Sequence, residues 1–221
     1  MLRTLTFATI GLSLAGLAAA QEVKVGTQPG ETLPGPFRAY VVTGDKATTP
    51  AGVVLSADRQ NLGDPGRISK FHDFVTRYGL DPVVAVFVRD NPPGADQPLT
   101  KLFKQLDAAV DKHRNGRLHA FGVFLTLKGE FFKDDQQSAQ VKQIETFAQQ
   151  AQLKNVPLAL DQAESERTKS YQLGLEQVVT VVIYNNLKVT SRSAFTLDKP
   201  IDDAGVQAVM AEVNKLVAPK K

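Results

Sequence analysis

The 221-residue chain contains no cysteine and no tryptophan, and it has only two methionines and three histidines. A chain without a thiol can carry out neither thiol–disulfide exchange nor thiol peroxidase chemistry, and it can form no thiolate metal site or iron–sulfur cluster. Because it can form no disulfide, its stability has to come from packing. Hydrophobic residues make up 43% and charged residues 22% of the sequence, which is typical of a globular protein with one core.

An excess of charge of one sign is also missing. The formal net charge is only +3, and the Lys and Arg residues are dispersed rather than clustered with aromatic residues, so we expect no nucleic-acid partner. The histidines, His72, His113 and His119, do not stand at metal-ligand spacing with carboxylates. No phosphate-binding glycine loop, G-x-S-x-G motif or paired-carboxylate signature occurs, so neither a metal nor a cofactor is predicted.

The first 20 residues differ from the rest of the chain. Arg3 is their only charge, the residues that follow are apolar and small, and Ala18 and Ala20 fit the small-x-small pattern of signal-peptidase cleavage before Gln21. We therefore expect a signal peptide over residues 1–20, cleaved after Ala20, with export to the periplasm or the extracellular space and no membrane attachment afterwards. The alternative is an uncleaved N-terminal anchor, whereas a lipoprotein anchor is excluded because no cysteine follows the apolar run.

The rest of the chain is consistent with one domain. The Gly- and Pro-rich stretch 21–36 is typical of a linker or an N-terminal arm. We expect a single domain over residues 37–217 and a tail at 218–221.

Within this domain, the hydrophobic pattern alternates between strands and helices. Strands alternating with helices predict an α/β protein with a parallel sheet and right-handed crossovers, and the turn at Asn185-Asn186 adds an antiparallel hairpin. The predicted strands cover 37–45, 52–56, 83–88, 118–127, 155–160, 178–184 and 187–195, and the predicted helices 67–79, 99–110, 141–151, 161–173 and 206–216.

This order of elements resembles the thioredoxin-like superfamily in its longer, peroxiredoxin-type form, the alkyl hydroperoxide reductase/thiol-specific antioxidant-like domain. Three stretches carry the resemblance, which spans residues 37–217. They are "VVAVFVRD" with the loop and helix after it, "VPLALD…KSYQLG", and "VVTVVIYNNLKVTSRSAF". The resemblance implies a thioredoxin-like α/β fold: a central mixed β-sheet flanked by helices, with a C-terminal β-hairpin and helix.

The same resemblance implies where a site would lie, and there the chain departs from the family. Redox members carry a cysteine at the N-terminus of the helix that follows the strand, but the matching segment, Asp90–Pro98, has none. They also carry a cis-proline before the first hairpin strand, whereas Val178–Thr180 contains no proline and a trans peptide is expected. Redox activity is therefore not carried over to this chain, and the site is degenerate.

The candidate site residues lie at the edge where α/β folds place their binding sites, beyond the C-terminal end of the strand 83–88. They are Arg89, Asp90, Asp96, Val179 and Thr180, which we call the vestigial-site residues. Each also has a plain structural interpretation: Asp96 could cap the helix, Asp90 could form an Asx-turn, and Arg89 could be solvated.

Two functions of different classes remain open at this point. In the first, the protein is a non-catalytic binding or structural module that docks a protein or peptide in a groove near Asp90 and Val179. In the second, it is a cysteine-independent enzyme that uses Arg89, Asp90 and Asp96. The sequence points to no particular ligand and specifies no oligomeric state.

Overall fold

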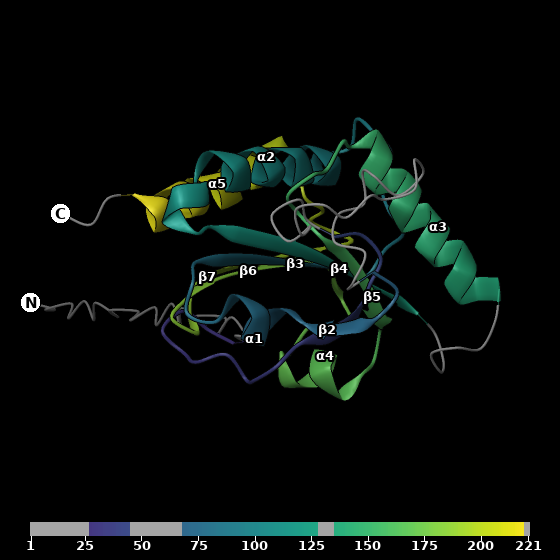
Figure 1. Ribbon diagram of the computed structural model, residues 1–221, viewed down its shortest axis with the longest axis horizontal. Coiled ribbons are helices and arrows are strands. Elements are labelled where there is room, and N and C mark those ends of the chain that lie inside the picture. Colours follow the sequence, from purple (N-terminus) through teal and green to yellow (C-terminus); the bar gives the residue numbers. More distant parts are fainter. Residues whose placement is uncertain (1–26, 45–67, 128–134, 219–221) are drawn as a thin grey trace, which may run out of the picture.

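The computed structural model describes residues 27–44, 68–127 and 135–218. These residues form a seven-stranded sheet between two layers of helices (Figure 1). In chain order the elements are β1 (Arg38–Val41), β2 (Phe71–Asp73), α1 (Phe74–Tyr78), β3 (Val83–Val88), α2 (Pro98–Lys112), the 3₁₀ turn η2 (Arg114–Gly116), β4 (His119–Leu127), α3 (Asp135–Gln150), β5 (Leu158–Gln162), α4 (Glu166–Ser170), β6 (Gln177–Asn185), β7 (Lys188–Thr196) and α5 (Asp203–Val217).

The strands lie in the order β2-β1-β5-β4-β3-β6-β7. β4 pairs in parallel with β3 and β5, as the alternating pattern predicts, while β6 runs antiparallel to both β3 and β7. The register of β3 on β6 joins Val83 to Tyr184 and Val88 to Val179. This pairing confirms the mixed sheet with a closing hairpin, and it makes the two most β-rich stretches of the sequence direct neighbours.

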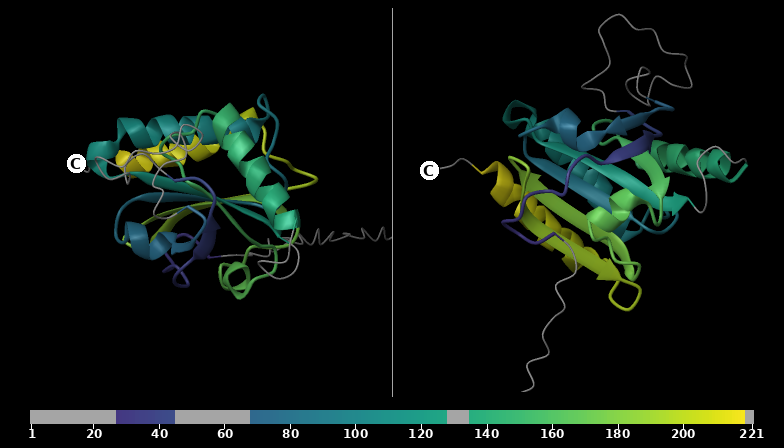
Figure 2. Two further views of the ribbon diagram at one scale, coloured as in Figure 1. Left: turned by 45° about the vertical axis from the view of Figure 1, so that its right-hand side comes forward. Right: turned by 90° about the horizontal axis from the view of Figure 1, so that it is seen from below.

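Helices cover both faces of the sheet, which explains why β3 is apolar throughout. In Figures 1 and 2, α2, α3 and α5 lie on one face, and α1 and α4 lie on the other. Val84, Val86 and Val88 belong to the core cluster under α2, α3 and α5. Their neighbours Val83 and Phe87 belong to the cluster on the α1 side. A strand covered on both faces needs no polar alternation.

Two predicted helices are shorter than their sequence patterns indicated. The helix predicted over 67–79 begins only at Phe74, because residues 71–73 pair with β1 as the edge strand β2 and Asp73 caps the helix. The helix predicted over 161–173 covers only Glu166–Ser170, because Asp161 still belongs to β5 and Ser165 is the N-cap. The strand predicted over 52–56 lies outside the described residues.

The hairpin turn lies one residue later than predicted. Asn186 and Leu187 adopt positive φ values of 51° and 60°, which is the backbone of a tight two-residue hairpin. Residues 30–33 run along the beginning of β7: Thr32 forms a bridge with Lys188, and Leu33 is buried. Within the described ranges no helix combines the length and the apolar character that a membrane span requires.

Candidate functional site

The candidate site lies where β3 ends, α2 begins and β6 begins. The backbone N–H of Arg89 donates to the carbonyl of Val178 at 2.8 Å, which extends the β3–β6 ladder by one residue beyond Val88. No cis peptide bond occurs in the described residues, so Val178–Thr180 is trans as expected. β6 is bonded to β3 on one side and to β7 on the other, which places this backbone inside the sheet.

Arg89 is half-buried and is held by the protein rather than lying free in solvent. Its guanidinium donates from Nη1 to the carbonyl of Ala163 at 2.6 Å and from Nη2 to the carbonyl of Leu173 at 2.7 Å. Burial lowers the pKa of Arg89, and the nearby carboxylates of Glu164 and Glu176 partly offset this effect. Arg89 therefore ties the end of β3 to the two segments that flank α4, and it makes no ion pair with Asp90 or Asp96.

Asp90 and Asp96 are both exposed, and neither has the predicted structural role. The Oδ1 atom of Asp90 accepts from the backbone N–H of the next residue, Asn91, at 2.7 Å, rather than closing an Asx-turn two residues on. The prediction that Asp96 caps α2 is wrong, because Gln97 is the N-cap and makes no side-chain cap bond. Instead, the Thr100 hydroxyl donates to the Gly94 carbonyl at 2.7 Å and holds the loop. Pro98 does occupy the first turn, as predicted.

Val179 and Thr180 are both buried but differ in role. Val179 faces a hollow that also borders Asp90, so the structure brings these two predicted residues together. The hydroxyl of Thr180 donates to Oε1 of Gln177 at 3.0 Å, and the same oxygen accepts from Nη2 of Arg192 at 3.1 Å. Thr180 and Arg89 do not line the hollow.

This hollow, of about 210 Å³, lies between the Asp90 loop and the start of β6. We call it the Leu197 groove, because the Leu197 side chain on its rim is 81% exposed. Asp90 is the only charged residue among the described residues that line it. Its other lining residues are mostly apolar: Val88, Asn91, Pro93, Gln97, Pro98, Leu99, Val178, Val179, Phe195, Thr196, Leu197, Pro200 and Ile201.

One wall of the Leu197 groove, from Phe195 to Ile201, was not predicted from the sequence. It lies about a hundred residues from the Asp90 loop, and only the β3–β6–β7 pairing brings the two together. The signal that could have found it is Leu197 in "FTLDKPI", an apolar residue that lies beyond the end of the predicted strand 187–195 and before the predicted helix 206–216.

The charged side chains behind the site hold α4 in place. The carboxylate of Asp161 is fully buried and accepts from Nε and Nη2 of Arg167 at 3.1 and 2.8 Å. This bond raises the pKa of Arg167. From β7, Arg192 donates to the carbonyls of Tyr171 and Gln172, and burial lowers its pKa. These groups are paired with the protein itself, which indicates a structural role.

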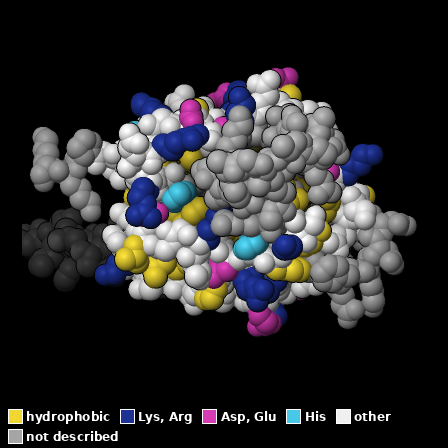
Figure 3. All heavy atoms as spheres, in the orientation of Figure 1, with side chains coloured by type: hydrophobic (Ala, Val, Ile, Leu, Met, Phe, Trp, Pro, Cys, Tyr) yellow, Lys and Arg dark blue, Asp and Glu magenta, His cyan; other side chains and the backbone are white. Residues whose placement is uncertain are grey.

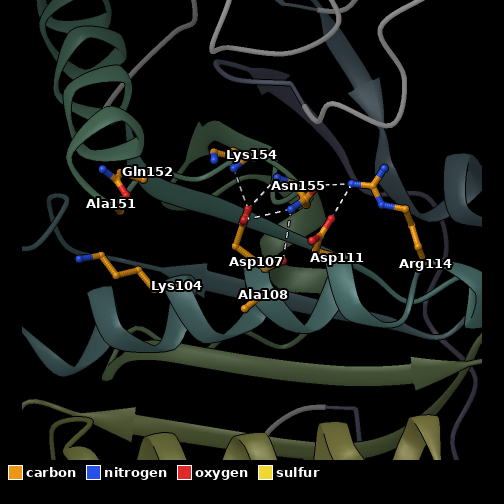
Figure 4. Close-up of a pocket in the computed structure, with 9 residues that line it drawn as sticks. All are labelled: Lys104, Asp107, Ala108, Asp111, Arg114, Ala151, Gln152, Lys154 and Asn155. Carbon is orange, nitrogen blue, oxygen red and sulfur yellow. Dashed lines mark hydrogen bonds and ion pairs between the residues drawn. The ribbon is translucent and has the colours of Figure 1, made fainter.

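A second, larger hollow of about 570 Å³ lies along α2 (Figure 4). Its centre is Asp107, whose Oδ1 accepts from the backbone N–H groups of Lys154, Asn155 and Val156 at 2.6–3.1 Å. The Asn155 side chain donates to Oδ2 of the same carboxylate at 3.0 Å. Arg114 links Asp111 to Asn155. We call this set the Asp107 junction; it fastens α2 to the segment before β5.

The histidines do not converge. His113 is the C-cap residue of α2, where a cation is favourable, and His119 lies 3.2 Å from Asp81 at the start of β4. His72 lies in β2. No group of three or more metal-ligating side chains occurs in the part of the chain that the structure describes. Lys and Arg side chains lie scattered among other residues on the face shown in Figure 3.

Comparison with known proteins gives a likeness of fold. No family model matches the sequence, and no curated protein matches it. Among solved structures, Mycobacterium tuberculosis AhpC matches 86% of this chain and 90% of its own, with 10% identity and a TM-score of 0.54. The peroxidoxin BcpB of the same organism matches 86% and 97%, with 15% identity and a TM-score of 0.51. Reduced 2-Cys peroxiredoxin of Plasmodium vivax matches 86% and 98%, with 14% identity and a TM-score of 0.50.

These likenesses show the fold of the molecule. The chain has a thioredoxin-like fold of the peroxiredoxin type, as the order of its elements predicted. It has that fold without any cysteine. At 10–15% identity the likeness concerns the fold, so function has to be argued from the site itself.

Proposed function

We propose that this protein is a non-catalytic binding module that docks an extended segment of a partner protein in the Leu197 groove. The main support is Leu197 itself, a large apolar side chain left 81% exposed on the rim of an otherwise mostly apolar hollow. Exposed apolar surface next to a concave site is typical of docking surfaces. Without a thiolate, this chain cannot form a mixed disulfide with the docked partner.

The shape of the site also favours docking over catalysis. A catalytic site usually needs an enclosed pocket with convergent polar groups. In the Leu197 groove, the described lining offers one carboxylate, Asp90, which is exposed. A cysteine-independent enzyme using Arg89, Asp90 and Asp96 has less support, because both terminal nitrogens of Arg89 are already bonded to carbonyl groups.

Site-specific photo-cross-linking tests the docking proposal. The photoreactive residue p-benzoylphenylalanine is placed at position 197 or, as a matched control, at Leu80, which is 63% exposed and precedes the start of β3. Irradiation in native envelope or culture medium should give discrete adducts at position 197 that an excess of a neutral, leucine-containing peptide suppresses. Equal adduct patterns at both positions, or adducts that the peptide leaves unchanged, would contradict the proposal.

The Asp90→Asn variant separates the two functional classes. Because Asp90 is exposed and makes one local bond, the variant should fold and should bind a neutral peptide as the parent protein does. An enzyme with Asp90 as its acid or base would lose turnover on the same change. Unchanged peptide binding supports a module, whereas loss of a measurable activity supports the enzyme.

We further propose that the module acts after export, on the basis of the N-terminal sequence. Mass spectrometry of protein recovered from the periplasmic fraction or the medium should find Gln21 as the first residue. A chain recovered only from the membrane fraction and beginning at Met1 would instead indicate the uncleaved anchor.

A further inference from the structure

The charge around the Leu197 groove is one-sided, although that of the whole chain is nearly balanced. Aspartates either line the groove or directly adjoin a lining residue, and adjacent Cα atoms are only about 3.8 Å apart. Asp90 lines it, Asp96 precedes Gln97, Asp198 follows Leu197 and Asp202 follows Ile201. Such a concentration of one sign contrasts with a formal net charge of +3 for the whole chain.

Few cations near the groove offset these carboxylates. Lys101, two residues beyond the lining residue Leu99, is paired with Asp203 at 2.8 Å, so the two cancel. The ammonium group of Lys199 forms no ion pair within the described residues. Arg89, the other nearby cation, is directed to the carbonyl groups beside α4. Four carboxylates and two cations, Lys199 and Arg89, therefore remain near the groove, and the guanidinium of Arg89 is turned toward the carbonyl groups beside α4.

Two of these carboxylates are free to meet a partner. Asp96 and Asp198 are exposed, and neither makes a hydrogen bond or ion pair with the rest of the described chain. Asp202 is partly occupied, because it caps α5 by accepting from the backbone N–H of Gly205 at 2.7 Å. The two residues come from different segments: Asp96 precedes the lining residue Gln97 at the start of α2, and Asp198 follows the lining residue Leu197 between β7 and α5.

On this basis we propose that the segment docking in the Leu197 groove carries an apolar side chain flanked by Lys or Arg residues. This inference rests on the proposed docking function. The apolar side chain would fill the hollow between Val178, Leu197 and Ile201, while the flanking cations would lie against Asp90, Asp96 and Asp198. Exposed ion pairs add little affinity each, but together they select a partner and raise its association rate.

Three synthetic nine-residue peptides test the inference by fluorescence anisotropy with the full mature chain. All carry one central leucine, and the residues on either side of it are lysine, serine or glutamate. At about 50 mM salt, where exposed charges are weakly screened, the lysine peptide should bind about tenfold more tightly than the glutamate peptide, with the serine peptide between them. At about 0.5 M salt the difference should shrink to roughly twofold.

A triple variant, Asp90→Asn with Asp96→Asn and Asp198→Asn, tests whether these three carboxylates are the source of the preference. All three side chains are exposed, so the fold should be kept, and the three peptides should then bind within roughly twofold of one another. Asp111→Asn is the matched control, because Asp111 is an exposed aspartate of the Asp107 junction, is paired with Arg114 and does not line the Leu197 groove. That control should keep the full preference for the lysine peptide.

The outcomes separate this inference from the docking proposal. If all three peptides bind alike and Leu197→Ser weakens all of them, docking stands and the cationic preference is wrong. A preference that survives in the triple variant also overturns the inference, since the carboxylates would not be its source. If no peptide binds, or if Leu197→Ser leaves the binding of all three peptides unchanged, both proposals fail.

Discussion

The two hollows beside α2 differ in what their polar and apolar groups do. At the Asp107 junction, a half-buried carboxylate accepts four hydrogen bonds, three from backbone N–H groups and one from Asn155. At the Leu197 groove, near the other end of the same helix, one leucine is exposed, and two of the four neighbouring aspartates make no hydrogen bond or ion pair within the described residues. The polar groups of the first hollow bond to other parts of the chain, whereas the second hollow keeps an apolar side chain exposed to solvent.

This difference shows why charge alone is a poor guide to function in this fold. Asp107, Asp161 and Arg89 are the kinds of residue that suggest catalysis, yet each is used to satisfy the backbone or a partner side chain. An apolar side chain that the protein leaves in water has no such internal use. It is the Leu197 groove, rather than the charged clusters, that points to a partner.

The largest expected effect is on the Asp107 junction. Asp107→Ala removes the acceptor of three backbone N–H groups, and donors left unpaired are costly, so the free energy of unfolding should fall by about 3 kcal/mol. Urea denaturation measures this loss, with Asp111→Ala as the control. Asp111 is exposed and paired only with Arg114, and its removal should cost about 0.5 kcal/mol or less. Equal losses for the two variants would contradict a structural role for the junction.

The next largest effect on stability is expected at Arg89. This residue lies next to the candidate site, but its hydrogen bonds go to backbone carbonyls beside α4. Arg89→Met leaves the carbonyls of Ala163 and Leu173 without their donor and should lower the free energy of unfolding by about 2 kcal/mol. Arg89→Lys, which can reach one carbonyl at a time, should lose about half as much. If Arg89→Lys kept the free energy of unfolding of the parent protein but changed peptide binding, Arg89 would instead serve the groove.

The smallest effect on stability is expected at Leu197. Since this side chain is 81% exposed, Leu197→Ser should change the free energy of unfolding by less than about 0.5 kcal/mol, as surface substitutions usually do. The same variant should weaken binding of the neutral leucine peptide at least about tenfold, because the rim supplies apolar contact area. Thermal unfolding measures the effect on stability, and an anisotropy titration of the same preparation measures the effect on peptide binding. A marked loss of stability would mean that Leu197 belongs to the core.

The fold was largely predictable from the sequence, for identifiable reasons. β3 and β6 are rich in β-branched residues, and α2 and α5 carry long apolar stripes, so pattern and length agree in each case. The misjudged elements are short. In β2 and α1, apolar residues at spacings of three and four fit a helix throughout, but pairing with β1 takes residues 71–73 into the sheet. Tertiary pairing of this kind leaves no local signal.

The candidate site was predictable only on one side. The end of the strand 83–88 and the resemblance to the family pointed to the Asp90 loop and Val179 as candidate site residues. In the structure both border one hollow. The opposite wall follows from how the chain returns after β7, which no local pattern encodes. The predicted cap by Asp96 failed because Thr100 ties down the loop through Gly94, leaving the carboxylate in solvent.

The most direct test of the central claim is an NMR titration of the isotope-labelled mature chain with the neutral leucine peptide. The claim predicts amide shifts that concentrate at Asn91, Val178, Leu197 and Ile201, with the amides of Lys154 and Asn155 at the Asp107 junction unchanged. Shifts that concentrate at the junction, or that spread evenly over both hollows, would contradict it.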